Sequence, residues 1–495
     1  METQTLRGLR VLRGKGFVAG ITLATALAFG PTSAATPSGP LYAIKGVKIF
    51  TAAGAPIDSG TIVMRNGVIE DVGANVTAPA DAVVIDGAGM NAYPGLIDMT
   101  NEAPIDTGEE PAAGAAAGRA GGGGGRGGAG AQTFTTLEEA ERAKHAIIMR
   151  PDFMAADHLR TSSQALTNLA SAGVTSVLAI PSTGIFRGQS ALVNTVIPPD
   201  DPQISTLADY RKGLAVVKSP VATHVNMSGR GGGQGYPGAL LGTIAFTKQG
   251  FLDAQWQRDA EAHYTRTGAK GPRPLIEPAL DALKPALARQ MPVALDANQA
   301  REIDRALAIA AQFNLDPIVV GASEANDRVA ELQKARARVI YSLSFPGGRG
   351  GGAGAGGAGG GRGGAAAAPS LAQLKAQQNA PKIPAALAQA SVPFAFTSGD
   401  LPSAGDFVRN AGRTVKDGGL TPDAALRALT IDAARIAGAA DRIGSLEKGK
   451  IANVVVTQGD LFDGGTVRHV FVDGRPIDLT TTPPATGTGR GRGGD

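Results

Sequence analysis

Short runs of alternating hydrophobic and polar residues open the regular part of the chain and return near its end. Residues 41–92 hold several such runs, and Asn66-Gly67 between two of them is typical of a tight hairpin turn. Residues 445–480 hold two more runs of the same kind. We therefore expect the two stretches to pair into one composite β-sandwich, with residues 93–444 between them as a separate domain.

The middle stretch, residues 93–444, alternates apolar runs of strand length with segments of helical periodicity. The candidate strands are 95–99, 174–180, 214–217, 292–297, 317–322, 339–343 and 393–397, and the candidate helices are 137–150, 299–313 and 323–337. A further helix is expected after Thr421, as N-cap, with Pro422 in its first turn. This alternation predicts an α/β fold with a parallel sheet, either doubly wound or closed into a (β/α)8 barrel.

Glycine-rich stretches interrupt this pattern at 112–131, 228–238 and 347–368, and a Gly/Arg tail follows at 481–495. Such segments bury too little apolar surface to order themselves. In a barrel the three internal stretches would be loops on the face where active sites lie. They are then either lids or tolerated expansions, since lengthening a surface loop costs little closure entropy.

The first 35 residues have the pattern of a secretory signal peptide. A basic stretch ending at Lys15 precedes an apolar run over 16–30 and small residues up to Ala35. The run is shorter than the roughly 20 residues that span a bilayer, which favours cleavage over a membrane anchor. We therefore expect a periplasmic or secreted protein without a membrane span in the mature chain.

The composition removes several function classes. The chain has no cysteine, which excludes thiol catalysis, thiolate metal sites and disulfides. Its net charge of +4 lies partly in the leader, so bulk charge does not indicate a nucleic-acid partner. The Arg/Gly segments resemble RNA-binding RGG sequences, but apart from Tyr236 they lack the interleaved aromatics that stack on bases.

Several motifs together resemble the amidohydrolase superfamily, in its imidazolonepropionase-like branch. The motifs are Asn66-Gly67-Val68-Ile69, Val84-Ile85-Asp86-Gly87, Tyr93-Pro94-Gly95-Leu96-Ile97-Asp98, Thr421-Pro422-Asp423-Ala424-Ala425-Leu426 and Ile443-Gly444-Ser445-Leu446-Glu447-Lys448-Gly449-Lys450. The resemblance covers about residues 41–480. It implies a (β/α)8 TIM barrel with a composite β-sandwich, and hydrolysis of carbon–nitrogen bonds other than peptide bonds.

The chain departs from the family at the metal ligands. Thr100 and Glu102 stand where the family has a His-x-His pair, and two imidazoles at that spacing can reach one metal from a strand. Asp296 and Gly321 fall at or near two further histidines of the family. Asp400 is the candidate for the catalytic aspartate that ends the last strand, and the other four residues are expected to line the substrate pocket.

Two interpretations follow from these replacements. In the first, the chain binds no metal or other cofactor and is a degenerate homologue, which acts as a binding protein or as the non-catalytic partner of an active relative or of its own copies. In the second, Glu102, Asp296 and Asp400 form a carboxylate site for Mg²⁺, Mn²⁺, Ca²⁺ or Zn²⁺, or an acid–base site with a raised pKa, in an active hydrolase of a small molecule. An alternative role for Asp296 is to cap the helix that begins near Gln299.

Overall fold

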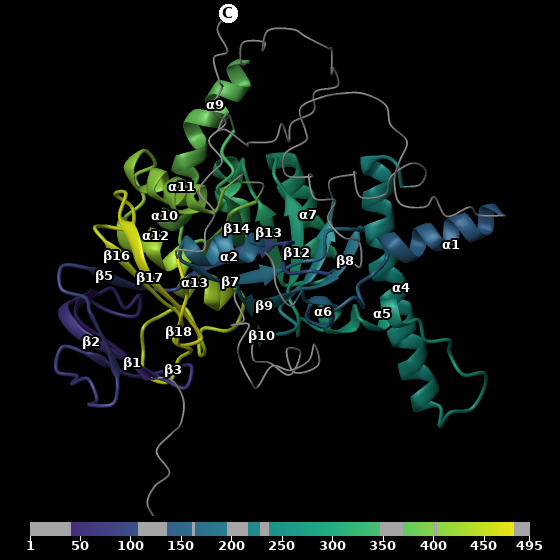
Figure 1. Ribbon diagram of the computed structural model, residues 1–495. Coiled ribbons are helices and arrows are strands. Elements are labelled where there is room, and N and C mark those ends of the chain that lie inside the picture. Colours follow the sequence, from purple (N-terminus) through teal and green to yellow (C-terminus); the bar gives the residue numbers. More distant parts are fainter. Residues whose placement is uncertain are drawn as a thin grey trace, which may run out of the picture. The chain divides into compact units, whose positions relative to one another are not determined.

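The computed structural model describes residues 41–106, 136–160, 164–195, 216–227, 237–346, 370–399, 401 and 403–479 (Figure 1). The predicted leader 1–35, the stretches 112–131 and 347–368 and the tail 481–495 lie outside these residues, as do Asp400 and all of 228–238 except its last two residues. The predictions on those segments stay predictions.

The two alternating stretches contribute to one eight-stranded sheet. Its order is β18-β17-β16-β5-β1-β2-β3, with β4 beside β1. The strands are β1 (Leu41–Ile49), β2 (Ile57–Arg65), β3 (Val68–Gly73), β4 (Val83–Asp86), β5 (Asn91–Pro94), β16 (Val454–Gln458), β17 (Thr466–Val472) and β18 (Arg475–Pro476). Antiparallel pairing of β5 with β16 joins the two ends of the chain within this sheet. The predicted domain boundaries stay predictions.

The middle of the chain forms two further sheets. A four-stranded sheet has the order β10-β9-β7-β6, and a six-stranded sheet has the order β15-β14-β13-β12-β11-β8. The strands are β6 (Leu96–Asn101), β7 (Val174–Ala179), β8 (Phe186–Gln189), β9 (Ala191–Asn194), β10 (Val216–Lys218), β11 (Thr223–Asn226), β12 (Val293–Ala297), β13 (Pro317–Gly321), β14 (Arg338–Ser342) and β15 (Phe394–Thr397). Strands β11 to β15 are parallel neighbours, whereas β8 runs antiparallel to β11.

The expected mixed α/β class is confirmed. Within the described ranges, however, the strand pairs leave all three sheets open, and the closed barrel is not confirmed. The parallel strands are buried along almost their whole length, as expected for strands covered on both faces.

Helices connect and cover these strands, and Figure 1 shows α7 beside β12 and β13. They are α1 (Leu137–Ile148), α2 (Gln164–Ser171), α4 (Leu240–Arg266), α5 (Pro278–Asp281), α6 (Lys284–Leu287), α7 (Ala300–Gln312), α8 (Val329–Lys334), α9 (Leu371–Asn379), α10 (Ile383–Gln389), α11 (Ala404–Lys416), α12 (Pro422–Leu429) and α13 (Ile431–Ile436). The predicted N-cap at Thr421 is confirmed, because its hydroxyl accepts a hydrogen bond from Ala424 N at 3.2 Å.

Apolar residues fill both sides of the middle strands. One cluster, which includes Ile97, Ala294, Ile318 and Ile340, gathers alternate residues of several strands. The larger cluster gathers the other faces of the strands with the helices. Among the described residues, no helix is long and apolar enough to span a membrane.

Candidate functional site

The parallel strands of the six-stranded sheet end together at one edge. Asn226 on β11 is level with Asp296 on β12, and Ser342 on β14 is level with Thr397 on β15. In open α/β sheets and in barrels, ligands bind beyond the carboxyl ends of the strands. The polar side chains near this edge therefore define the candidate site.

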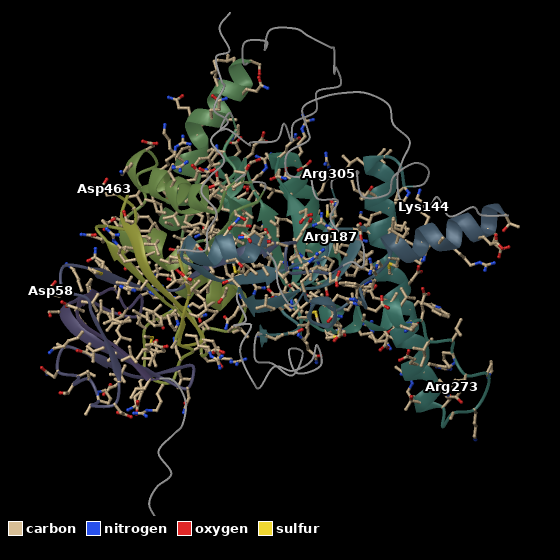
Figure 2. The ribbon with its side chains drawn as sticks, in the orientation of Figure 1. Asp58, Lys144, Arg187, Arg273, Arg305 and Asp463 are labelled. Carbon is tan, nitrogen blue, oxygen red and sulfur yellow. The ribbon has the colours of Figure 1, made fainter. Side chains whose placement is uncertain are left out.

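An arginine from the antiparallel strand β8 reaches this edge. Arg187 lies between Phe186 and Gly188, which pair with Val225 and His224 of β11. Its guanidinium forms an ion pair with Asp296, with 3.1 Å between Arg187 Nη2 and Asp296 Oδ2. The two side chains are only 13% and 20% exposed. Figure 2 shows Arg187 amid the strands, whereas Arg273 lies at the far end of the segment that follows α4.

Burial dominates the electrostatics of this pair. It raises the pKa of Asp296 above its ordinary value, and the nearby Glu302 carboxylate acts in the same direction. The positive charge of Arg187 opposes both effects. Removing either partner would leave a largely buried charge unpaired, which is strongly destabilising.

The fully buried His224 lies next to this ion pair. Among the residues that the structure describes, neither of its ring nitrogens has a hydrogen-bond partner, and neither does Arg187 Nε. Burial, followed by the positive charge of Arg187, lowers the pKa of His224 to about 3. The imidazole is therefore neutral near pH 7, so the site combines one guanidinium, one carboxylate and one uncharged ring.

A second polar cluster joins the edge strands β6 and β15. The fully buried Asp98 carboxylate accepts hydrogen bonds from the Ser398 backbone N–H at 2.8 Å and the Ser398 hydroxyl at 2.6 Å. It also accepts from the Thr397 hydroxyl at 2.9 Å and from Asn101 Nδ2 at 3.0 Å. Burial raises the pKa of Asp98, against the opposing effect of these donors. Asp98 is part of a family motif in the sequence, but its role as a buried hydrogen-bond acceptor was not predicted. An aspartate inside an otherwise apolar strand could have indicated that role.

Two of the predicted pocket residues lie at the end of β6 in different surroundings. Thr100 is buried, and its hydroxyl is 2.5 Å from the Thr397 hydroxyl, so it joins the Asp98 cluster. Glu102 is exposed, and its backbone carbonyl accepts a hydrogen bond from Ile105 N. The structure thus brings Thr100 to the last strand and leaves Glu102 facing solvent.

Gly321 has a backbone that a histidine would not readily adopt. Its φ is +95°, in the left-handed region that favours glycine. A Cβ atom placed there would lie 2.3 Å from Asn298 Oδ1. The Asn298 side chain therefore fills the space next to Gly321. The family has a metal-binding histidine at or near this position.

The candidate metal ligands among the described residues lie apart from one another. Within the ranges that the structure describes, no three histidine, aspartate or glutamate side chains come together. Asp296 is paired with Arg187 and does not cap α7, because Gln299 is the N-cap and Glu302 Oε2 accepts from Gln299 N at 3.1 Å. Since Asp400 lies outside the described residues, the three-carboxylate site stays a prediction.

Part of the chain matches a known protein family. Residues 362–477 match the model of the amidohydrolase family. No curated protein matches the chain significantly. The predicted resemblance to the amidohydrolase superfamily is confirmed by this match, together with the fold of the solved structures below.

Several solved structures align with most of this chain, and the first one named here is similar to it in fold. An amidohydrolase from Thermotoga maritima has a TM-score of 0.66 and 20% identity, over 88% of this chain and 99% of its own. A putative prolidase from Bifidobacterium longum has a TM-score of 0.47 and 17% identity, over 88% and 94%. Molinate hydrolase has a TM-score of 0.48 and 15% identity, over 90% and 96%. At these identities the likeness concerns the fold alone.

Proposed function

We propose that this protein is a degenerate amidohydrolase, whose (β/α)8 barrel binds a small molecule or a partner subunit without a catalytic metal. The proposal joins two parts, a closed barrel and a site in which a protein cation takes the place of the metal. Different contacts support each part.

Contacts at both junctions between the two middle sheets support a closed barrel. At one junction, Asp98 of β6 is bonded to Thr397 and Ser398 at the end of β15. At the other, Ser190 links β8 to β9, and its backbone exchanges hydrogen bonds with Ala222 and Val221, which precede β11. Each sheet thus contacts the other at both ends, which is the arrangement that a closed barrel requires.

The Arg187–Asp296 ion pair is the observation that most strongly supports a site without a catalytic metal. Asp296 falls at or near a metal-ligand position of the family, and its carboxylate is bonded to a largely buried guanidinium. A metal ion there would have to displace or repel that fixed positive charge. The neighbouring candidate position, Gly321, supplies no donor side chain. A barrel with this donor set retains a polar interior but lacks the means to acidify a water molecule with a metal.

Calorimetric titration of the purified mature protein with Zn²⁺, Mn²⁺ and Mg²⁺ tests this proposal. We expect no saturable binding by the wild-type protein. Asp296→Asn and the exposed control Asp58→Asn should behave alike. Stoichiometric binding that is lost in Asp296→Asn and kept in Asp58→Asn would contradict the metal-free site.

A second candidate function is favoured by the raised pKa of Asp296. A carboxyl group that holds its proton more tightly than usual suits acid–base catalysis of carbon–nitrogen bond hydrolysis. A screen of small amide and cyclic imide substrates would reveal such an activity. Turnover that Asp296→Asn abolishes and Asp58→Asn leaves unchanged would favour this candidate.

Export to the periplasm or medium belongs to the same proposal and rests on the pattern of residues 1–35. N-terminal sequencing of protein recovered from a periplasmic fraction should begin after Ala35. Full-length protein confined to the cytoplasm would contradict export.

A further inference from the structure

The longest described helix buries polar residues and exposes apolar ones. Its buried positions include Thr243, Thr247, Gly250 and Gln257, alongside Phe251 and Ala254. Its exposed positions include Leu241, Leu252 and Trp256, which are 81%, 46% and 68% exposed. Figure 1 shows the C-terminal half of α4 and the loop after it extending away from the strands. Exposed large apolar side chains grouped on one helix, as Leu252 and Trp256 are, are typical of interaction sites.

Internal contacts explain the buried face of α4. A Cβ atom on Gly250 would lie 2.7 Å from the Phe186 ring, so glycine allows the helix to pack against β8. The Gln257 side chain donates to the Glu277 carbonyl and accepts from Glu277 N, which fixes the chain after the helix. Nothing in these contacts requires leucine or tryptophan on the opposite face.

Residues on the outer side of the helix follow one stripe. Steps of three or four residues connect Leu241, Ala245, Lys248, Leu252, Trp256, Asp259 and His263, which we call the α4 stripe; Lys248 is half-buried and the other six are exposed. This spacing keeps side chains on one face and is the spacing of helices that pair with another helix. At about 1.5 Å per residue, the stripe is about 33 Å long.

We propose that the α4 stripe binds the same stripe of a second copy of this protein, with the two helices antiparallel around a two-fold axis. An axis midway between Leu252 and Trp256 packs each of these residues against the other residue of the second copy. The same axis places Ala245 opposite His263, and it brings Lys248 to within one residue of the level of Asp259. The apolar pair Leu252–Trp256 and the charged pair Lys248–Asp259 thus each occur twice, as a two-fold interface requires.

The distribution of charge on the stripe favours this occupant and this direction. The only charged residue in its N-terminal half is Lys248, and the C-terminal half carries Asp259. A parallel pair would place Lys248 against Lys248, whereas the antiparallel pair forms two opposite-charge contacts. The exposed ion pair of Asp259 with Arg258 on the same helix is of a type that contributes little in water. Antiparallel helices also oppose their macrodipoles favourably.

The size of the stripe indicates a dimer that depends on concentration. One helix pair buries less than the roughly 800 Å² per partner of a typical stable interface. The protein should therefore pass from monomer to dimer between nanomolar and high micromolar concentrations. Trp256 is the only tryptophan in the chain, so intrinsic fluorescence reports on the proposed interface alone.

Analytical ultracentrifugation and tryptophan emission across that concentration range test the proposal. We expect the sedimentation coefficient to rise to that of a dimer and the emission to shift to the blue over the same range, as the indole leaves water. Trp256→Glu should weaken the dimer at least about tenfold. The matched control Leu371→Glu, on the exposed face of α9, should leave it unchanged. A monomer throughout the range, or a dimer that Trp256→Glu does not weaken, would overturn the proposal.

A charge exchange tests the direction of the helices. Lys248→Glu and Asp259→Lys should each weaken the dimer about two- to fivefold, since they place like charges opposite each other. The double variant Lys248→Glu/Asp259→Lys should recover most of the wild-type affinity. Losses that add in the double variant would overturn the antiparallel pairing.

Discussion

The buried His224 predicts a specific dependence of stability on pH. Its pKa is lowered from 6.5 to about 3 in the folded protein, whereas the unfolded chain binds a proton below about pH 6.5. Between these values the unfolded state binds more protons, so the free energy of unfolding rises with pH. The stabilisation is fully present above about pH 6.5 and is lost as the pH falls toward 3. The slope is up to about 1.4 kcal/mol per pH unit, or about 5 kcal/mol over the whole window.

Urea unfolding of the wild-type protein and of His224→Leu, from pH 4.5 to 7.5, measures this contribution. The pKa values of Asp98 and Asp296 are raised in the folded protein. The contribution of these two groups to the free energy of unfolding therefore falls as the pH rises above about 4. Because both proteins contain them, the difference between the two proteins isolates the histidine. We expect the wild type to lose about 3 kcal/mol relative to His224→Leu between pH 7 and 4.5.

His469 provides a comparison within the same chain. Its pKa is also lowered, first by burial and then by the charge of Arg468, but its side chain is only partly buried. His469→Gln should therefore remove a smaller part of the pH dependence than His224→Leu. A difference between wild type and His224→Leu that is constant across the range would refute the reasoning, because it would mean that the imidazole titrates normally in the folded protein.

Three further changes test the two polar clusters, each by chemical denaturation at pH 7. Asp98→Ala should lower the free energy of unfolding by about 3–5 kcal/mol, because four donors lose a buried acceptor, whereas the exposed Asp58→Ala should stay within about 1 kcal/mol. Arg187→Met should destabilise by about 3–5 kcal/mol, and Arg187→Met/Asp296→Leu should recover most of that loss; a double variant as unstable as the single one would argue against the pair. Gly321→His should lower the free energy of unfolding by at least about 2 kcal/mol, because the backbone has a positive φ there and the Asn298 side chain is adjacent. We also expect that it creates no zinc site. Stoichiometric zinc binding by a stable variant would contradict this.

The parallel strands could be predicted because their residues are buried on both faces. Such strands are continuous apolar runs, and the predicted run 292–297 differs from β12 by one residue. The helix after Thr421 could be predicted because its N-cap and first-turn proline are local signals. The contact between β6 and the end of β15 could not be predicted in the same way, since it joins residues about 300 positions apart, Asp98 and Ser398.

The short strands β8 and β11 were missed, and they carry most of the candidate site. Each has four residues, and the polar side chains of Arg187 and His224 interrupt their apolar pattern. These residues are stable in the interior only because they contact a partner or remain neutral. No local pattern in the sequence reports such a contact. Asp296 was found from a family position, but its pairing with Arg187 needed the antiparallel register of β8.

The sequence places His263 in a polar helix, but the bounds of this helix, α4, were not predicted, for a related reason. Helix prediction relies on an apolar face that points to the core, and the core-facing positions of α4 are mainly threonine, glycine, alanine and glutamine. Its leucine and tryptophan residues lie on the opposite face. The exposed Leu252 and Trp256 on that face are the basis of the proposed dimer.

Metal content, determined by elemental mass spectrometry, tests the central claim most directly. The purified mature protein would be measured as isolated and after incubation with Zn²⁺, Mn²⁺ and Mg²⁺ followed by desalting, beside Asp296→Ala and Glu102→Ala. Replacement of the metal by the Arg187 guanidinium predicts metal far below one ion per chain in every sample. Near-stoichiometric metal in the wild type that disappears in Asp296→Ala would contradict it, and would make the chain a carboxylate-dependent hydrolase candidate.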